Sequence, residues 1–175
     1  MTDTSTLYAE HQQAVFRYLC RFVGQADSAR DLTQEVFLRV SRTRVPDADA
    51  AGLRAWVFAI ARNLALNHVR DRRPRETTFA HASAEPAVQE LSVAIAQALD
   101  ALDDTDRDAF LLREAGGLSY QEIAVACELT VEAVRTRLKR ARQQLREALD
   151  GPVRVHRLRP ISLRAGEPRK SRDGI

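Results

Sequence analysis

The chain has 175 residues, of which 45% are apolar, 29% are charged and only 6% are aromatic, with a formal net charge of +3. This composition is that of an ordinary soluble protein with one domain or two small ones, and it argues against β-sandwich, collagenous and low-complexity chains. No run of 18 apolar residues and no signal peptide is present, so we expect no membrane insertion. Cys20 and Cys127 have no CxxC partner, which indicates a reduced, cytoplasmic protein without a disulfide framework.

Apolar residues recur at helical spacing through most of the first 150 residues, and no alternating, strand-like pattern interrupts them. In chain order, these apolar stripes cover residues 7–22, 32–40, 53–64, 91–102 and 134–145. Capped helix starts are predicted where a hydroxyl residue precedes a carboxylate by three positions, at Ser28, Thr105 and Ser119. The sequence therefore predicts an all-α fold.

Two prolines, small residues and mixed charges interrupt the helical pattern between residues 71 and 90. We therefore expect a helical domain over residues 1–73, a flexible linker over 74–90 and a second helical domain over 91–150. Residues 151–175 carry seven basic and two acidic side chains. This basic segment is predicted to be disordered, and it is either an electrostatic tether to nucleic acid or a neutral extension.

Signatures of catalysis are missing from the sequence, which has no GxxxxGK, GxGxxG, GxSxG or HExxH motif. Asp104, Asp106 and Asp108 resemble the start of a calcium loop, but Ala109 and Ala115 replace the glycine and the glutamate that such a loop needs. A polar turn that favours the start of the next helix explains these aspartates better. We expect no enzyme activity, no cofactor and no metal.

Residues 118–146 have the layout of a helix-turn-helix, with Ser119 capping one helix and Thr130 capping the next after a tight turn. The second helix carries six cations and no anion between residues 135 and 146. Such a run is either a solvated face or a DNA-binding surface. Because residues 91–132 hold nine acidic groups and two basic ones, the cations are confined to this helix, which favours DNA.

A second candidate surface lies on the helix that begins near Leu53, where polar and aromatic side chains follow one flank. Its members are Trp56, Asn63, Asn67 and Arg70. An indole, two amides and a guanidinium can stack on unpaired bases and donate hydrogen bonds to them. The alternative, which the pattern alone favours, is that Trp56 belongs to the core and the amides lie at its edge.

The chain resembles the bacterial RNA polymerase sigma factors of the extracytoplasmic-function (ECF) group in three ordered stretches: DLTQEVFLRV (31–40), LRAWVFAIARNLALNHVR (53–70) and AFLLREAGGLSYQEIAVACELTVEAVRTRLKRAR (109–142). The resemblance implies a protein that binds core RNA polymerase and directs promoter recognition and opening. Its implied partners are promoter DNA, the β′ clamp coiled coil and β subunit of the polymerase, and an anti-sigma factor. The alternative is a helix-turn-helix repressor or activator that acts without the polymerase.

The resemblance also implies roles for individual residues. Those matching the polymerase-docking segment are Asp31, Gln34, Glu35 and Phe37, with a core role as the alternative for Phe37. Those matching the segment that opens and holds the −10 element are Arg54, Trp56, Arg62, Asn63, Asn67 and Arg70. Those matching the −35 contacts are Arg135, Thr136, Arg137, Lys139 and Arg140. Two departures from the family pattern are Glu128, at a turn position that often holds glycine, and Ala133, which replaces a hydroxyl residue.

Overall fold

The computed structural model describes residues 4–71 and 86–150, and within these ranges it contains helices and no strand. The helices are α1 (Thr4–Val23), α2 (Ala26–Arg42), α3 (Ala50–Asp71), α4 (Pro86–Asp100), α5 (Asp104–Glu114), α6 (Tyr120–Cys127) and α7 (Val131–Asp150). The predicted all-α fold is confirmed. Most of the expected linker, residues 74–85, and the basic segment 151–175 lie outside the described residues.

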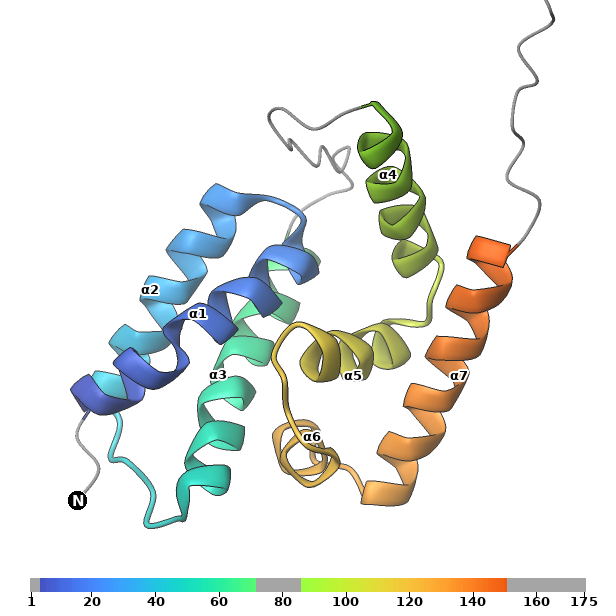
Figure 1. Ribbon diagram of the computed structural model, residues 1–175. Helices are drawn as coiled ribbons and strands as arrows, with labels where there is room; N and C mark the ends of the chain where they lie inside the picture. Colours follow the sequence, from blue (N-terminus) through green and yellow to red (C-terminus); the bar gives the residue numbers. More distant parts are fainter. Residues whose placement is uncertain (1–3, 72–85, 151–175) are drawn as a thin grey trace, which may run out of the picture.

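Helices α1, α2 and α3 pack against one another and form the first unit (Figure 1). The apolar stripe expected in α1 is buried here, because residues three and four apart lie on the same side of a helix. Its buried members are Leu7, Ala14, Val15, Tyr18, Leu19 and Phe22. No described helix combines the length and the low charge that a membrane-spanning segment needs.

Helices α4 to α7 form the second unit, in which α7 packs on α4, α5 and α6. The expected stripe of α7 is buried in full, at Val134, Leu138, Ala141 and Leu145. Helix α4 begins at Pro86, five residues before the apolar stripe that predicted it, so the end of the expected linker is helical. Proline fits this first position because its missing N–H would have no partner inside the helix.

Of the three helix caps predicted from a hydroxyl residue three positions before a carboxylate, one is confirmed and two are wrong. Ser119 forms a capping box with Glu122 at the start of α6. Ser28, in contrast, is a buried residue inside α2, which begins earlier, after Gln25. At α5, the cap is Asp103, whose carboxylate accepts a hydrogen bond from the Thr105 backbone N–H at 3.0 Å. The turn before α5 contains several aspartates whose oxygens could cap the helix equally well, and Asp103 is the one that does so.

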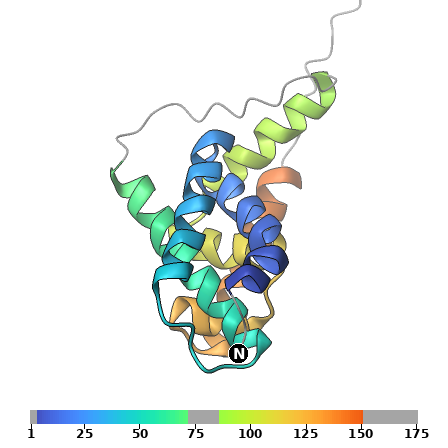
Figure 2. The ribbon, with the colours of Figure 1, turned by 90° about the vertical axis from the view of Figure 1, so that its left-hand side faces the viewer.

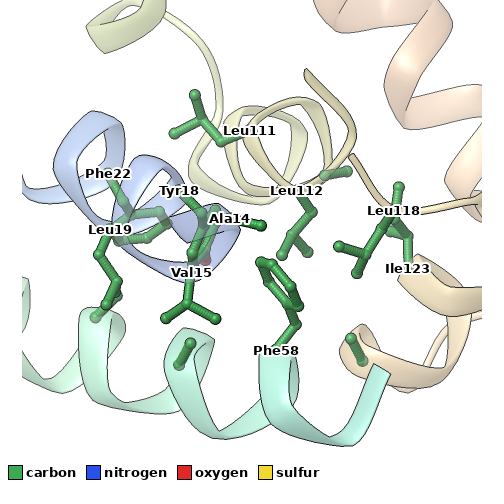
Figure 3. Packing of buried hydrophobic residues seen from close by; sticks show 14 of the residues in the cluster. Ala14, Val15, Tyr18, Leu19, Phe22, Phe58, Leu111, Leu112, Leu118 and Ile123 are labelled. Carbon is green, nitrogen blue, oxygen red and sulfur yellow. The ribbon is translucent and has the colours of Figure 1, made fainter. Parts of the chain in front are cut away.

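The two units share one continuous hydrophobic core, whereas the sequence predicted two units joined only by a linker. Helix α3 packs on α6 and α1 packs on α5, so that α5 and α6 lie behind the first unit in Figure 2. The fully buried ring of Phe58 points from α3 toward Leu112 and Leu118 (Figure 3). Gly116 permits this approach, since a Cβ there would lie 2.9 Å from Cε1 of Phe58.

Candidate functional site

The segment from α6 to α7 has the helix-turn-helix geometry that its sequence predicted. The Ser119 N–H donates to Glu122 Oε2 at 2.6 Å, and the Glu122 N–H donates to Ser119 Oγ at 3.2 Å. Thr130 Oγ1 accepts from the Ala133 N–H at 3.2 Å and caps α7. These caps satisfy backbone donors that the first turns leave free, and they hold the two helices at a short turn.

Glu128 ends α6 in the left-handed conformation, with φ 55° and ψ 45°. It is the one non-glycine residue with a positive φ among the residues that the structure describes. The strain predicted for this departure from the family pattern is therefore present, and it amounts to roughly 1–2 kcal/mol for a residue with a Cβ. Glu128 is also exposed, which places a carboxylate at the turn before α7.

Among the described residues, three of the five side chains predicted to contact the −35 element make no hydrogen bond or ion pair to another helix. Arg135, Thr136 and Lys139 are exposed. Arg135 makes one ion pair, with Glu132 on the preceding turn at 3.5 Å, and both side chains are mostly exposed. An exposed pair of this kind is weak, because water and salt screen it. The Arg135 guanidinium can therefore exchange Glu132 for a phosphate or a base edge.

The other two predicted −35 residues bind the neighbouring helix α5 within the same unit. Arg140 holds the buried carboxylate of Asp106 with Nε 2.5 Å from Oδ2 and Nη2 2.9 Å from Oδ1. Arg137 Nη1 lies 3.6 Å from the same carboxylate and donates to Thr105 Oγ1. The hydrogen bond that Arg140 donates to the Asp106 carboxylate raises the pKa of Arg140. The sequence shows that an acidic run precedes a basic helix. Residue spacing alone does not show which acidic side chain pairs with which arginine.

A basic groove of ≈ 550 Å³ extends beyond the predicted residues along α7. Its lining residues are Tyr120, Arg135, Lys139, Arg142, Gln143, Arg146 and Glu147. Arg142 also pairs with Glu114 at 3.0 Å, and its hydrogen bond to the hydroxyl of Tyr120 lowers the pKa of that phenol. Arg142 and Arg146 were missed as site residues, although they continue the helical spacing of Arg135 and Lys139.

On α3, the predicted −10 residues separate into an exposed group and a group that faces the second unit. Asn63, Asn67 and Arg70 are exposed, and Arg70 Nη2 donates to Asn67 Oδ1 at 2.5 Å. Trp56 is half-buried and packs against the core, which is the alternative that the pattern alone favoured. The structure therefore brings two amides and one guanidinium together on the open flank of α3.

Arg54 and Arg62 instead hold groups of the second unit. Arg54 Nη2 donates to the Gly116 carbonyl oxygen at 2.8 Å, and Nη1 lies 3.9 Å from Glu122 Oε1. Arg62 Nε donates to Asp108 Oδ2. Neither partner lies near these arginines in the sequence, so their inward orientation could not be predicted from the pattern of α3.

Asp108 lies at the centre of a polar cluster between the two units, and 2% of its surface is exposed. Besides Arg62, it accepts a hydrogen bond from the Tyr18 hydroxyl at 2.8 Å, and Cys127 Sγ lies 4.0 Å away. Burial and the Asp108 charge raise the pKa of Tyr18 well above its usual value and that of Cys127 to about 12. Both groups are therefore neutral at physiological pH.

The predicted polymerase-docking residues lie on α2. Asp31 and Gln34 are exposed, while Glu35 accepts a hydrogen bond from Arg39 Nε at 2.8 Å. Phe37 is 6% exposed and contacts the ring of Tyr8 edge to face, with 4.9 Å between centroids. Its position is that of the core alternative, and the exposed apolar side chains beside the docking residues are Tyr8 and Leu38.

Within the described part of the chain, no group of three or more His, Cys, Asp or Glu side chains is placed to hold a metal ion. The chain does, however, match known proteins. The family models described as Sigma-70 region 2 and Sigma-70, region 4 match residues 7–75 and 92–145.

Two relatives illustrate the match in sequence. The chain is 31% identical to the RNA polymerase sigma-H factor of Pseudomonas aeruginosa over 167 residues, which cover 85% of this chain and 86% of that protein. It is 33% identical to the ECF RNA polymerase sigma factor SigC of Mycobacterium tuberculosis over 142 residues, which cover 77% and 76% of the two proteins.

Two solved structures are similar in fold. CnrH, in complex with the cytosolic domain of CnrY, matches with a TM-score of 0.68 and 27% identity over 85% of this chain and 88% of CnrH. The sigma factor RpoE of Bartonella quintana, in complex with the anti-sigma factor NepR, matches with a TM-score of 0.65 over 87% and 99% of the two chains. At 21% identity, the second likeness supports the fold alone.

Proposed function

Since the chain belongs to the sigma-70 family of RNA polymerase sigma factors, within its ECF group, we propose that its two helical units divide promoter recognition between them. As a sigma factor it binds core RNA polymerase and directs it to promoters. In this proposal the unit of residues 1–73 docks on the polymerase and holds the −10 element, and the unit of residues 91–150 binds the −35 element. The reaction itself belongs to the polymerase, in the cytoplasm, and this chain contributes binding rather than catalysis.

We assign docking on the β′ clamp coiled coil to the exposed face of α2. Asp31 and Gln34 offer a carboxylate and an amide without a strong internal partner to displace. Tyr8 is 45% exposed and Leu38 is 47% exposed, and both line a hollow together with Gln34. An apolar centre with polar groups around it is the usual anatomy of a protein–protein interface. Phe37 supports this surface from below by packing on Tyr8.

Capture of the melted −10 strand falls to the open flank of α3. Asn63 and Asn67 can donate to and accept from the edges of unpaired bases, and Arg70 can bind a phosphate or stack on a base. Trp56 is half-buried, so part of its indole is available for stacking. Extruding a base costs a few kcal/mol, which contacts to polymerase and to this flank must offset.

Binding of the −35 element falls to α7 in the major groove, and one observation carries this assignment. Arg135, Thr136 and Lys139 are exposed in the first turns of a helix that follows a doubly capped turn. The first turns of a recognition helix are those that meet base edges. Arg142 and Arg146 extend the basic groove along the helix and contact the phosphate backbone there.

We further propose that an anti-sigma factor binds this chain and regulates it. The similar RpoE structure is a complex with an anti-sigma factor. The apolar groove of ≈ 880 Å³ between the units, lined by residues that include Phe16, Ile95, Leu99 and Phe110, is a site at which such a protein can dock.

Run-off transcription tests the proposal. Core polymerase is assayed with and without the chain on a genomic promoter library, and start sites are mapped by sequencing. New start sites that share two spaced upstream elements are the expected result. DNA binding by the chain alone, without new start sites, would instead favour the helix-turn-helix repressor or activator.

A further inference from the structure

One carboxylate interrupts the basic surface of α7. Between Val131 and Arg146 the helix carries six cations and a single acidic residue, Glu132, which lies in its first turn. The Glu132 side chain is 78% exposed, and its carboxylate lies 3.5 Å from Nη1 of Arg135. DNA is a polyanion, so a carboxylate on the surface that meets it weakens binding unless it finds a hydrogen-bond donor there. The position of Glu132 on the helix therefore decides whether it opposes DNA binding or contacts a base.

Glu132 lies on the side of α7 opposite the buried stripe. At 3.6 residues per turn it is rotated by about 160° from Val134, and Thr136 and Gln143 lie on the same side. Arg135 is rotated by only about 100°, which places it on the flank of this side. Figure 1 shows α7 on the part of the second unit that faces away from α1, α2 and α3. When such a helix enters the major groove, the side opposite its own core meets the base edges and the flanks meet the phosphates.

A carboxylate that meets base edges can only accept hydrogen bonds. In the major groove the donors are the amino groups at cytosine N4 and adenine N6, whereas guanine and thymine present acceptors. Adenine also presents N7, an acceptor that repels a carboxylate beside its amino group. The cytosine edge has no acceptor in the groove. Among the four bases, cytosine therefore fits the Glu132 carboxylate best.

We propose that Glu132 determines part of the −35 specificity of this chain by accepting a hydrogen bond from N4 of a cytosine. This inference rests on the proposed function, because it takes α7 as the helix that enters the major groove of the −35 element. In the free chain, Arg135 neutralises the carboxylate. On DNA, the guanidinium moves to a phosphate and the cytosine amino group replaces it, and this exchange costs little because the ion pair is exposed.

The neighbouring side chain of Thr136 leaves this arrangement undisturbed. Its hydroxyl donates to the backbone carbonyl oxygen of Glu132 at 3.0 Å, and not to the carboxylate. The carboxylate is thus held at the start of the helix by its own backbone and by one exposed ion pair. It can turn toward a base without breaking a buried contact.

Selection of DNA from a randomised library tests this inference. The full-length chain, alone and bound to core RNA polymerase, is equilibrated with duplexes whose central segment is random, and the bound DNA is sequenced. The parent should prefer cytosine at one position. In Glu132→Gln the new amide can pair with N6 and N7 of adenine, so the ratio of cytosine to adenine at that position should fall by about fivefold or more.

Glu147→Gln is the matched control, since it makes the same charge change at an exposed position near the other end of α7. Any effect of the lost negative charge on overall affinity is common to both variants, whereas the base preference should change only in Glu132→Gln. If Glu132→Gln loses helicity by circular dichroism, Glu132→Ala replaces it. That variant should lose the preference for cytosine without gaining one for adenine.

An unchanged ratio of cytosine to adenine in the folded variant would overturn the inference, and so would a parent selection without a preferred cytosine. A lower thermal stability of Glu132→Gln with the parent's base preference would show that Glu132 only stabilises the start of α7. The selection by the chain alone contains no polymerase. An absence of promoter-directed transcription by the parent would therefore count against the proposed function and not against the role of Glu132.

Discussion

The guanidinium of Arg140 binds the fully buried carboxylate of Asp106 through two nitrogens, at 2.5 and 2.9 Å. The hydrogen bond from Nη2 to Oδ1 and the ion pair between Nε and Oδ2 link α7 to α5. Arg137 approaches the same carboxylate from one turn earlier. Helix α7 is therefore held by cations of its own surface, since Arg137 and Arg140 bind groups of α5, whereas Arg135 pairs only within α7.

The first prediction concerns stability. Replacing both Arg137 and Arg140 by alanine leaves the Asp106 carboxylate buried without its cations. We expect the free energy of unfolding to fall by about 1–3 kcal/mol, the cost of leaving a buried acceptor without its partners, because the Arg140 side chain is itself 54% exposed. Urea denaturation followed by circular dichroism measures it. The control is the double variant Arg135→Ala with Lys139→Ala, which should stay within about 0.5 kcal/mol of the parent. Equal losses in the free energy of unfolding would show that Arg137 and Arg140 stabilise the fold no more than Arg135 and Lys139 do.

The second prediction concerns DNA binding by that same control variant. Arg135 and Lys139 are exposed on α7, so their removal should take away two phosphate contacts without changing the fold. On duplex DNA, the slope of log K against log salt should become shallower by about 1.8. Fluorescence anisotropy over a salt series provides the measurement. A parent-like slope would exclude this face of α7 from the DNA interface.

The third prediction concerns the turn between α6 and α7. Glu128 has a φ of 55°, which glycine adopts without a steric penalty. Glu128→Gly should therefore raise the free energy of unfolding by up to about 1 kcal/mol. Glu128→Gln keeps the strain and removes only the charge, so it should leave stability unchanged. Thermal denaturation of the three proteins separates the two effects, and a gain in the glutamine variant would attribute the effect to charge instead.

The fourth prediction concerns alkaline pH. The pKa of Cys127 is raised from 9.0 to about 12, so the folded state keeps the thiol proton where the unfolded state has lost it. Its contribution to stability is complete below pH 9 and is lost as the pH rises toward 12, at up to about 1.4 kcal/mol per pH unit. Tyr18 acts in the same direction above its usual pKa. Urea unfolding at about pH 7.5, 9 and 10.5 should show this decline in the free energy of unfolding. Cys127→Ala should make the decline smaller.

The fifth prediction concerns polymerase docking. Asp31→Arg combined with Gln34→Ala changes two exposed side chains of α2, so it should weaken binding to core polymerase by about tenfold or more, or about 1.4 kcal/mol. Duplex DNA binding by the same full-length variant should be unchanged, because α7 lies in the other unit. Glu10→Arg, a charge reversal at an exposed position of α1, is the control. A parallel loss of polymerase and DNA binding would indicate misfolding.

The sequence by itself determined the helices and the helix-turn-helix, because both depend on local signals. The apolar stripe of α7 and the caps at Ser119 and Thr130 were predicted and are present. Side chains three and four apart share a helix face whatever surrounds them, and a capping side chain reaches only its own first turn. Where several oxygens competed, as before α5, the same local signals placed the cap wrongly.

Only the tertiary structure decided which polar side chains remain free. Arg62 and Arg140 look like other exposed cations in the sequence, but their carboxylate partners lie 46 and 34 residues away. Helical periodicity gives the direction of a side chain relative to its own helix and contains no information about the helix packed against it. Burial makes this pairing strong, because a carboxylate removed from water must find a cation within reach. The shared core places Asp106 and Asp108 there.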